Sequence, residues 1–175
     1  MKFGVIISAL PVLAAFTGCM TSKPEMMGNM SQKLDMASFY LPNAEASRVV
    51  SITTNGPVAA NILVQTQAVA VKETGPRETV AKFGEVYAFS PTFFAVHRDE
   101  PTLIRFWNLQ PDDNHDFMLI DPHSRVLMSV LLPPLKEISY VFTFHEEGLF
   151  NLVCAMHRPS MNAQVLVLPP ASSSR

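Results

Sequence analysis

Four residues that can bind a soft metal ion lie in the last third of the chain. The segment "CAMHRPSM", residues 154–161, contains Cys154, His157 and Met161, and His115 precedes it in the segment "NHDFMLI". A strand that ends at Cys154 and opens into a tight loop can direct the loop side chains to one point, and a neighbouring strand can supply His115. Two imidazoles, one thiolate and a weak thioether are the ligand set of a mononuclear type 1 copper site.

Other uses of these residues fit the pattern less well. Zinc accepts cysteine and histidine, but methionine is a poor zinc ligand, and a binuclear copper site needs two cysteines in the loop. A disulfide between Cys19 and Cys154 is the alternative use of the two cysteines in an oxidising compartment. The remaining histidines, His97, His123 and His145, lie among turn-forming and charged residues, which predicts surface positions.

From Arg48 onward the chain consists of short runs of β-branched and aromatic residues. Many runs alternate between apolar and polar residues, and turn-forming segments separate them, which predicts antiparallel strands. The runs include "ANILVQTQAVAVKET", "ETVAKFGEVYAF", "TLIRFWNL", "HDFMLI" and "LFNLVCAM". With 14 prolines and no internal repeat, the pattern predicts one all-β domain, a sandwich or a barrel. The formal net charge of -2 provides no basic stripe and argues against a nucleic-acid partner.

The N-terminal region has the composition of a targeting signal followed by a linker. Residues 1–19 combine Lys2 with an apolar stretch that ends in "FTGC", and they resemble a bacterial lipoprotein signal in which Cys19 receives the lipid. Cleavage by an ordinary signal peptidase is the alternative. Residues 20–47 are rich in methionine and turn formers, and we expect a flexible tether. The protein is therefore expected to be exported and lipid-anchored, in the periplasm or at the outer face of a membrane.

The ligand segments and their flanks resemble the cupredoxin family of plastocyanin-like and azurin-like type 1 blue copper proteins. The similar motifs are "YAFSPTFFAVHRDEPTLIRFWN", "NHDF" and "FTFHEEGLFNLVCAMH", within residues 85–168. The resemblance implies a Greek-key β-sandwich over residues 48–170 that holds one type 1 copper. It implies a trigonal set of three ligands, His115, Cys154 and His157. Met161 would be the axial ligand.

The residues next to these ligands depart from the usual family pattern. Many members carry a hydroxyl residue directly after the cysteine, whereas this chain has Ala155. Asp116, which follows the first histidine, is therefore expected to accept hydrogen bonds from backbone N–H groups near Cys154. Such a contact outside the ligand set tunes the thiolate.

The resemblance implies an electron carrier rather than an enzyme. One copper would cycle between Cu(I) and Cu(II), and a monomer would exchange electrons with a cytochrome or a copper enzyme docked near His157. The alternative is a copper-binding and delivery lipoprotein, because the methionines of the tether are soft ligands. These methionines also fit a linker without any metal-binding role. A third hypothesis, a red-copper enzyme with an open coordination position, requires that Met161 does not bind.

Overall fold

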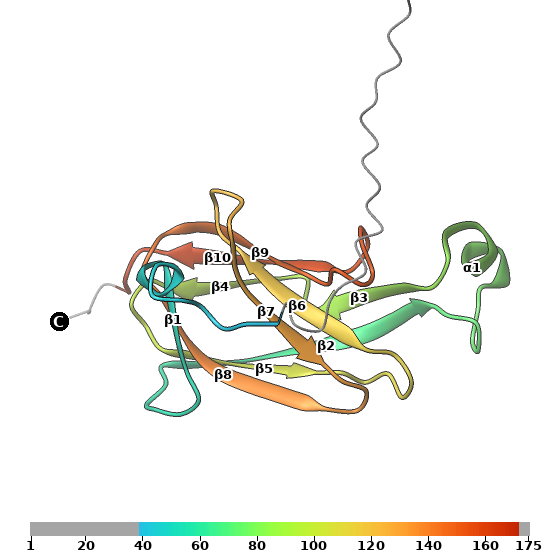
Figure 1. Cartoon of the computed structure of the whole chain (residues 1–175), viewed down its shortest axis with the longest axis horizontal. Helices are drawn as coiled ribbons and strands as arrows, with labels where there is room; N and C mark the ends of the chain where they lie inside the picture. The colour runs from blue at the N-terminus through green and yellow to red at the C-terminus, as the bar shows by residue number, and fades with distance from the viewer. Residues whose placement is uncertain (1–38, 172–175) are drawn as a thin grey trace, which may run out of the picture. The chain divides into compact units, whose positions relative to one another are not determined.

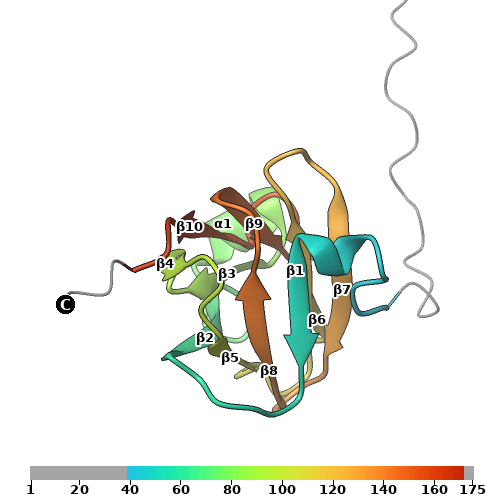
Figure 2. The same ribbon diagram turned by 90° about the vertical axis from the view of Figure 1, so that its left-hand side faces the viewer.

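The computed structural model describes residues 39–171, which form two five-stranded sheets (Figures 1 and 2). The first sheet has the strand order β1-β8-β5-β2-β3, and the second has the order β4-β10-β9-β6-β7. The strands are β1 (Val50–Thr53), β2 (Ala60–Ala70), β3 (Val86–Ser90), β4 (Phe93–His97), β5 (Thr102–Trp107), β6 (His115–Ile120), β7 (Val126–Leu132), β8 (Glu137–Phe144), β9 (Gly148–Val153) and β10 (Asn162–Leu168). Two short helices complete the fold, η2 (Ala46–Arg48) and α1 (Arg77–Phe83).

The hydrophobic core lies between the two sheets and follows from the period-two alternation of the strands. In β5, Thr102, Ile104 and Phe106 are buried while the residues between them are half-buried. The ring of Phe106 stacks on that of Phe117 from β6, with centroids 3.7 Å apart and planes 11° apart. This contact joins the first sheet to the second, because β5 and β6 belong to different sheets.

The connections between strands pass repeatedly from one sheet to the other. Between β3 and β6 each successive strand changes sheet, and the chain crosses again from β7 to β8 and from β8 to β9. Crossovers of this kind are typical of Greek-key sandwiches. The predicted all-β Greek-key sandwich is confirmed. Not every neighbouring pair is antiparallel as predicted. Strands β2 and β5 pair in parallel, and so do β10 and β4.

The segment "ETVAKFGEVYAF" was predicted as one strand-like run, and this prediction is wrong for its first half. Residues 77–83 form α1, and only the second half enters a strand, β3. Pro76 precedes the helix, and Gly84 follows it with φ of 77° while donating its N–H to Val80. Glu78, Ala81 and Lys82 favour a helix over a strand, and these local preferences decide the conformation because no residue of α1 is buried. Within the described part of the chain, no helix is long and apolar enough to span a membrane.

The chain joins the domain before the predicted end of the tether at residue 47. The backbone of Tyr40 pairs antiparallel with Ser129 of β7, with N–O distances of 2.7 and 3.0 Å. Ala46, in η2, is buried, and η2 leads directly into β1 (Figure 2). Cys19 and the remainder of the tether lie outside the described residues.

Gly148 is the first residue of β9, directly after the turn that follows β8, and only glycine fits at this position. Its φ is +127°, and a Cβ there would lie 2.9 Å from Cγ of Pro122. Gly56 has a similar φ of +143°, but its Cβ would meet nothing within 4 Å. We expect Gly148→Ala to lower the free energy of unfolding more than Gly56→Ala, by about 1 kcal/mol or more, because of the added overlap. Urea unfolding of both variants measures this difference, and equal losses would contradict it.

Candidate metal centre

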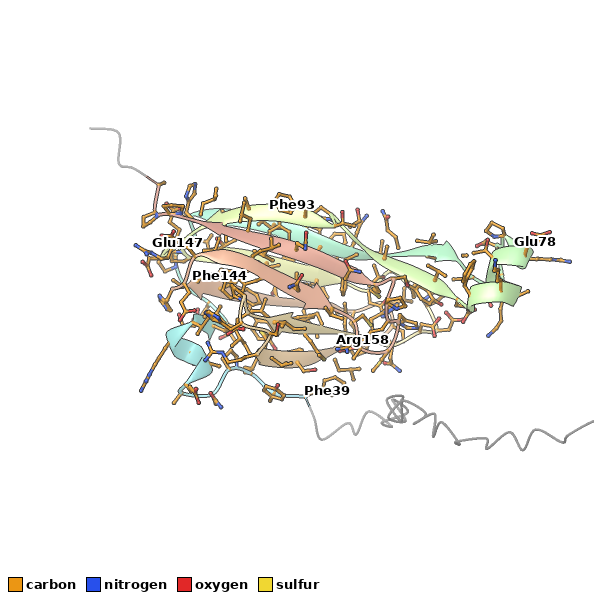
Figure 3. All side chains as sticks on the ribbon, turned by 90° about the horizontal axis from the view of Figure 1, so that it is seen from above. Phe39, Glu78, Phe93, Phe144, Glu147 and Arg158 are labelled. Carbon is orange, nitrogen blue, oxygen red and sulfur yellow. The ribbon has the colours of Figure 1, made fainter. Side chains whose placement is uncertain are left out.

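His115, Cys154 and His157 converge at one end of the sandwich. His115 opens β6, Cys154 directly follows β9, and these strands pair antiparallel, so the start of one lies beside the end of the other. The Nδ1 atoms of the two histidines are 3.0 Å apart. The Sγ atom of Cys154 lies 3.6 Å from Nδ1 of His157 and 3.9 Å from Nδ1 of His115. Figure 3 places Arg158, from the same loop, toward the end of the domain that carries Glu78 of α1, and places Glu147 at the opposite end.

The three ligand atoms are spaced as a bound metal ion requires. A circle through three points at these separations has a radius of roughly 2.1 Å, close to the 2.0–2.3 Å of metal–nitrogen and metal–sulfur bonds. His115 and Cys154 are fully buried, and His157 is half-buried. The donor set, two imidazoles and a thiol, therefore fits a copper ion.

A dense set of hydrogen bonds holds the loop between Cys154 and Met161. The N–H of Cys154 donates to the carbonyl of Met161 at 3.0 Å, and the N–H of Met161 donates to the carbonyl of His157 at 3.1 Å. The side-chain amide of Asn162 donates to the carbonyl of Pro159 at 2.9 Å. Met161 is fully buried within the core. Its role as the axial ligand remains a prediction, whereas its backbone closes the loop.

Asp116 connects the start of β6 to the ligand loop. Its Oδ1 atom accepts hydrogen bonds from the N–H groups of Ala155 at 2.9 Å and Met156 at 3.3 Å, which are the backbone contacts that the sequence predicts. The thiol of Cys154 lies 3.3 Å from the same oxygen. Burial raises the pKa of the Asp116 carboxyl. Met156 is half-buried and packs against the core.

Tyr87 and Asn108 belong to the surroundings of the site but were not singled out from the sequence. The Tyr87 ring packs edge-on against the rings of His115 and His157, with centroids 4.9 and 4.5 Å away. Its hydroxyl donates to Oδ2 of Asp113, and Asn108 donates to the backbone carbonyl of Asp113 at 2.7 Å. In the sequence, Tyr87 is simply an alternating strand residue. Its contact with the two imidazoles becomes visible only in the folded structure, where β3 lies close to the start of β6.

Burial sets the protonation of the three central side chains. It lowers the pKa of His115 to about 4, with the neighbouring His157 adding to the effect, and it also lowers the pKa of His157. Burial, followed by the nearby Asp116, raises the pKa of the Cys154 thiol to about 12. At neutral pH both imidazoles are therefore neutral, while the thiol keeps its proton until a metal ion displaces it.

Metal binding at neutral pH is therefore expected to release one proton per ion, from Cys154. Because both imidazoles are already neutral, the apparent affinity should rise about tenfold per pH unit between about pH 7 and pH 9. Co(II) titrations in weakly buffered solution with a pH indicator measure both quantities. An affinity that does not change with pH would show that the thiol is already ionised and would contradict this assignment.

The other three histidines lie elsewhere. Nδ1 of His97 is 2.6 Å from the carbonyl of Pro169. The imidazole of His145 forms two hydrogen bonds, one from Nδ1 to Asp99 at 2.8 Å and one between Nε2 and Ser51 at 3.0 Å. These bonds connect β1 to the turn between β4 and β5. His123 follows β6 in an exposed turn. Among the described residues, only His115, Cys154 and His157 form a group of potential metal-binding side chains.

The domain is similar in fold to solved copper proteins at low sequence identity. Auracyanin A, a "blue" copper protein from Chloroflexus aurantiacus, is 18% identical with a TM-score of 0.44, over 65% of this chain and all of its own. Amicyanin from Paracoccus versutus is 15% identical with a TM-score of 0.44, over 68% of this chain and 97% of its own. A purple cupredoxin from Nitrosopumilus maritimus is 19% identical with a TM-score of 0.40, over 61% of this chain and 99% of its own. No family model matches the sequence, and no curated protein matches it.

Proposed function

We propose that this protein is a cupredoxin that carries single electrons on one copper ion. His115, Cys154 and His157 would hold the ion in a trigonal set, with Met161 on the axis. Copper bound to such ligands supplies a one-electron couple between Cu(I) and Cu(II). The observation that carries the proposal is the compact triangle of two Nδ1 atoms and one Sγ atom.

The surroundings of the site suit electron transfer because they hold the ligands in one geometry. Asp116 fixes the first residues of the loop, and Asn162 fixes its last turn. Burial of His115 and Cys154 keeps bulk water away from the ligand atoms. His157 is the one half-buried member of the triangle. A redox partner, a cytochrome or a copper enzyme, would therefore dock beside His157 in a small and short-lived complex.

Voltammetry of the copper-loaded protein tests the proposal. We expect a reversible one-electron wave and a Cys154-dependent visible absorption, with the copper retained when a Cu(I) chelator is added. The matched control is the same protein loaded with zinc, which should show neither the wave nor the absorption, since zinc has no redox chemistry. An irreversible wave together with rapid copper loss to the chelator would reject an electron carrier.

Copper delivery is the second candidate function. The direction in which the chain before β1 approaches the metal centre favours it. Tyr40 pairs antiparallel with Ser129, and β7 runs on to Leu132, which lies opposite His115. The chain therefore enters the domain from the end that carries the metal centre. Met36 precedes Tyr40 by four residues, a separation that an extended chain spans over at most about 14 Å. Delivery would use the methionines of the tether as soft ligands for a second Cu(I).

A Cu(I) titration distinguishes delivery from electron transfer. Delivery predicts a second Cu(I) equivalent that disappears when Met26, Met27, Met30 and Met36 are changed to leucine, because leucine keeps the bulk and removes the sulfur. An unchanged stoichiometry of one copper would leave electron transfer as the function.

We also propose that the protein is exported and anchored by a lipid on Cys19. Small residues precede Cys19 at the end of the apolar stretch. Cys19→Ala should move the protein from the membrane fraction to the soluble exported fraction, because it removes the attachment atom. Fractionation of cells that express each form measures this. Continued retention in the membrane would contradict Cys19 as the anchor.

A further inference from the structure

One tyrosine ring bridges the two sheets at the metal centre. Tyr87 lies on β3, at the edge of the first sheet, whereas His115 and the loop with His157 belong to the second sheet. Only 1% of the Tyr87 surface is exposed. Its ring meets that of His115 at 72° and that of His157 at 60°. A single side chain therefore contacts both imidazoles from the opposite sheet.

The hydroxyl of this tyrosine is anchored in the loop between β5 and β6. It donates to the carboxylate of Asp113. The side-chain amide of Asn108, which is buried, donates to the carbonyls of Asp113 at 2.7 Å and of Leu132 at 3.0 Å. Thr66 donates to Oδ1 of Asn108 at 3.1 Å. These bonds fix Asp113, and thereby Tyr87, to the strands on both sides of the site.

The orientation of His115 lacks its usual support. A metal-binding histidine almost always donates its second ring N–H to a carboxylate, a carbonyl or water, which fixes the ring. In the described structure, Nε2 of His115 is buried and has no hydrogen-bond partner. Its Nδ1 atom lies 3.0 Å from that of His157, so the one hydrogen bond open to this ring nitrogen in the metal-free protein is to the other imidazole, and a bound metal ion would replace it. The packing of the Tyr87 ring must therefore orient the imidazole of His115, as a hydrogen bond does for other metal-binding histidines.

We propose that Tyr87, held by Asp113, is a positioning residue that fixes both imidazoles in the geometry for metal binding. The proposal rests on the proposed copper site. A tyrosine that only fills the core would affect folding stability when changed. A positioning tyrosine would also change the metal affinity and the mobility of the imidazoles, and these readouts separate the two roles.

The test compares substitutions that remove the ring, the hydroxyl or its anchor. Tyr87→Leu removes the ring, and Tyr87→Phe keeps the ring but loses the bond to Asp113. Tyr140→Leu is the matched control, because this half-buried tyrosine of β8 packs on Phe142 and lies outside the two imidazole contacts. The measurements are Cu(I) affinity by competition with a chelator and the ¹H–¹⁵N imidazole spectrum of the metal-free protein.

Tyr87→Leu should weaken Cu(I) binding about tenfold or more and broaden the imidazole signals of His115 and His157. Tyr87→Phe should keep most of the affinity, whereas Tyr140→Leu should lower stability without changing affinity. Equal affinities of Tyr87→Leu and the wild type would overturn the proposal, as would an equal loss in Tyr140→Leu. If Tyr87→Leu does not fold, Asp113→Ala carries the test. Broadened imidazole signals in that variant support the positioning role, and unchanged signals overturn it.

The imidazole spectrum also separates this proposal from the proposed function. If the wild-type protein gives no Cys154-dependent absorption with copper, the proposed function fails. The spectrum of the metal-free variants still reports whether Tyr87 orders the two rings. If the wild type does show that absorption and the variants behave like it, only the positioning role fails.

Discussion

A Cys154→Ser variant is expected to lose the strong visible absorption of the copper-loaded protein, centred at roughly 600 nm. The Sγ atom is the one sulfur in the triangle of ligand atoms, and it is fully buried between the two imidazoles. Serine keeps the size of the side chain, but its hydroxyl is a hard donor that does not form the covalent bond of a thiolate to copper. Titration with Cu(II), followed by visible and paramagnetic resonance spectra, measures the loss.

Cys19→Ser is the control for this variant, because it changes the only other cysteine of the chain. Its copper-loaded form should keep the absorption at full intensity. If Cys154→Ser remained coloured, the thiolate would not be a ligand. If both variants lost the colour, the two cysteines would act together, and the assignment of the metal to Cys154 alone would be wrong.

Phe117→Ala is expected to lower the free energy of unfolding by about 3–5 kcal/mol. Phe117 is fully buried and stacks on Phe106 at 3.7 Å, so that truncation leaves a cavity between the sheets. It also follows His115 by two residues in β6, and both side chains are buried. Loss of the ring should therefore weaken copper binding as well. Denaturant unfolding of the metal-free protein and a copper titration measure the two effects.

Phe93→Ala provides the matched control, since the Phe93 side chain is 52% exposed at the edge of the second sheet (Figure 3). This variant should change the free energy of unfolding by less than about 0.5 kcal/mol. Similar losses at the two positions would mean that burial between the sheets does not determine the stability of the domain.

Most of the strands could be predicted from local sequence patterns. A strand that buries one face alternates between apolar and polar residues, and this alternation is visible in the sequence. The runs at β5, β6 and β9 all became strands, and the spacing of Cys154 and His157 predicted two of the three side chains that the structure brings together. The helix α1 escaped prediction because its apolar residues, such as Val80 and Phe83, resemble those of a strand. With no buried face, local preferences decide its conformation.

The contacts around the ligands could not be predicted in the same way. Tyr87 and Asp113 are far apart in the sequence and meet only because β3 and the loop before β6 lie at the same end of the two sheets. Asp116 was an exception, since its position beside His115 and the missing hydroxyl at Ala155 indicated where its carboxylate must bond. Sequence spacing can therefore predict candidate ligands within one loop, whereas the residues that pack around them come from other strands.

The most direct measurement is the copper K-edge X-ray absorption spectrum of the loaded protein in both oxidation states. Two imidazole nitrogens and one thiolate sulfur at roughly 2.0–2.3 Å are the predicted scatterers. The distances should change little between Cu(I) and Cu(II), because the buried loop holds the ligand atoms in place. A spectrum that contains only nitrogen and oxygen neighbours, or one that loses a ligand on reduction, would contradict the proposed electron carrier.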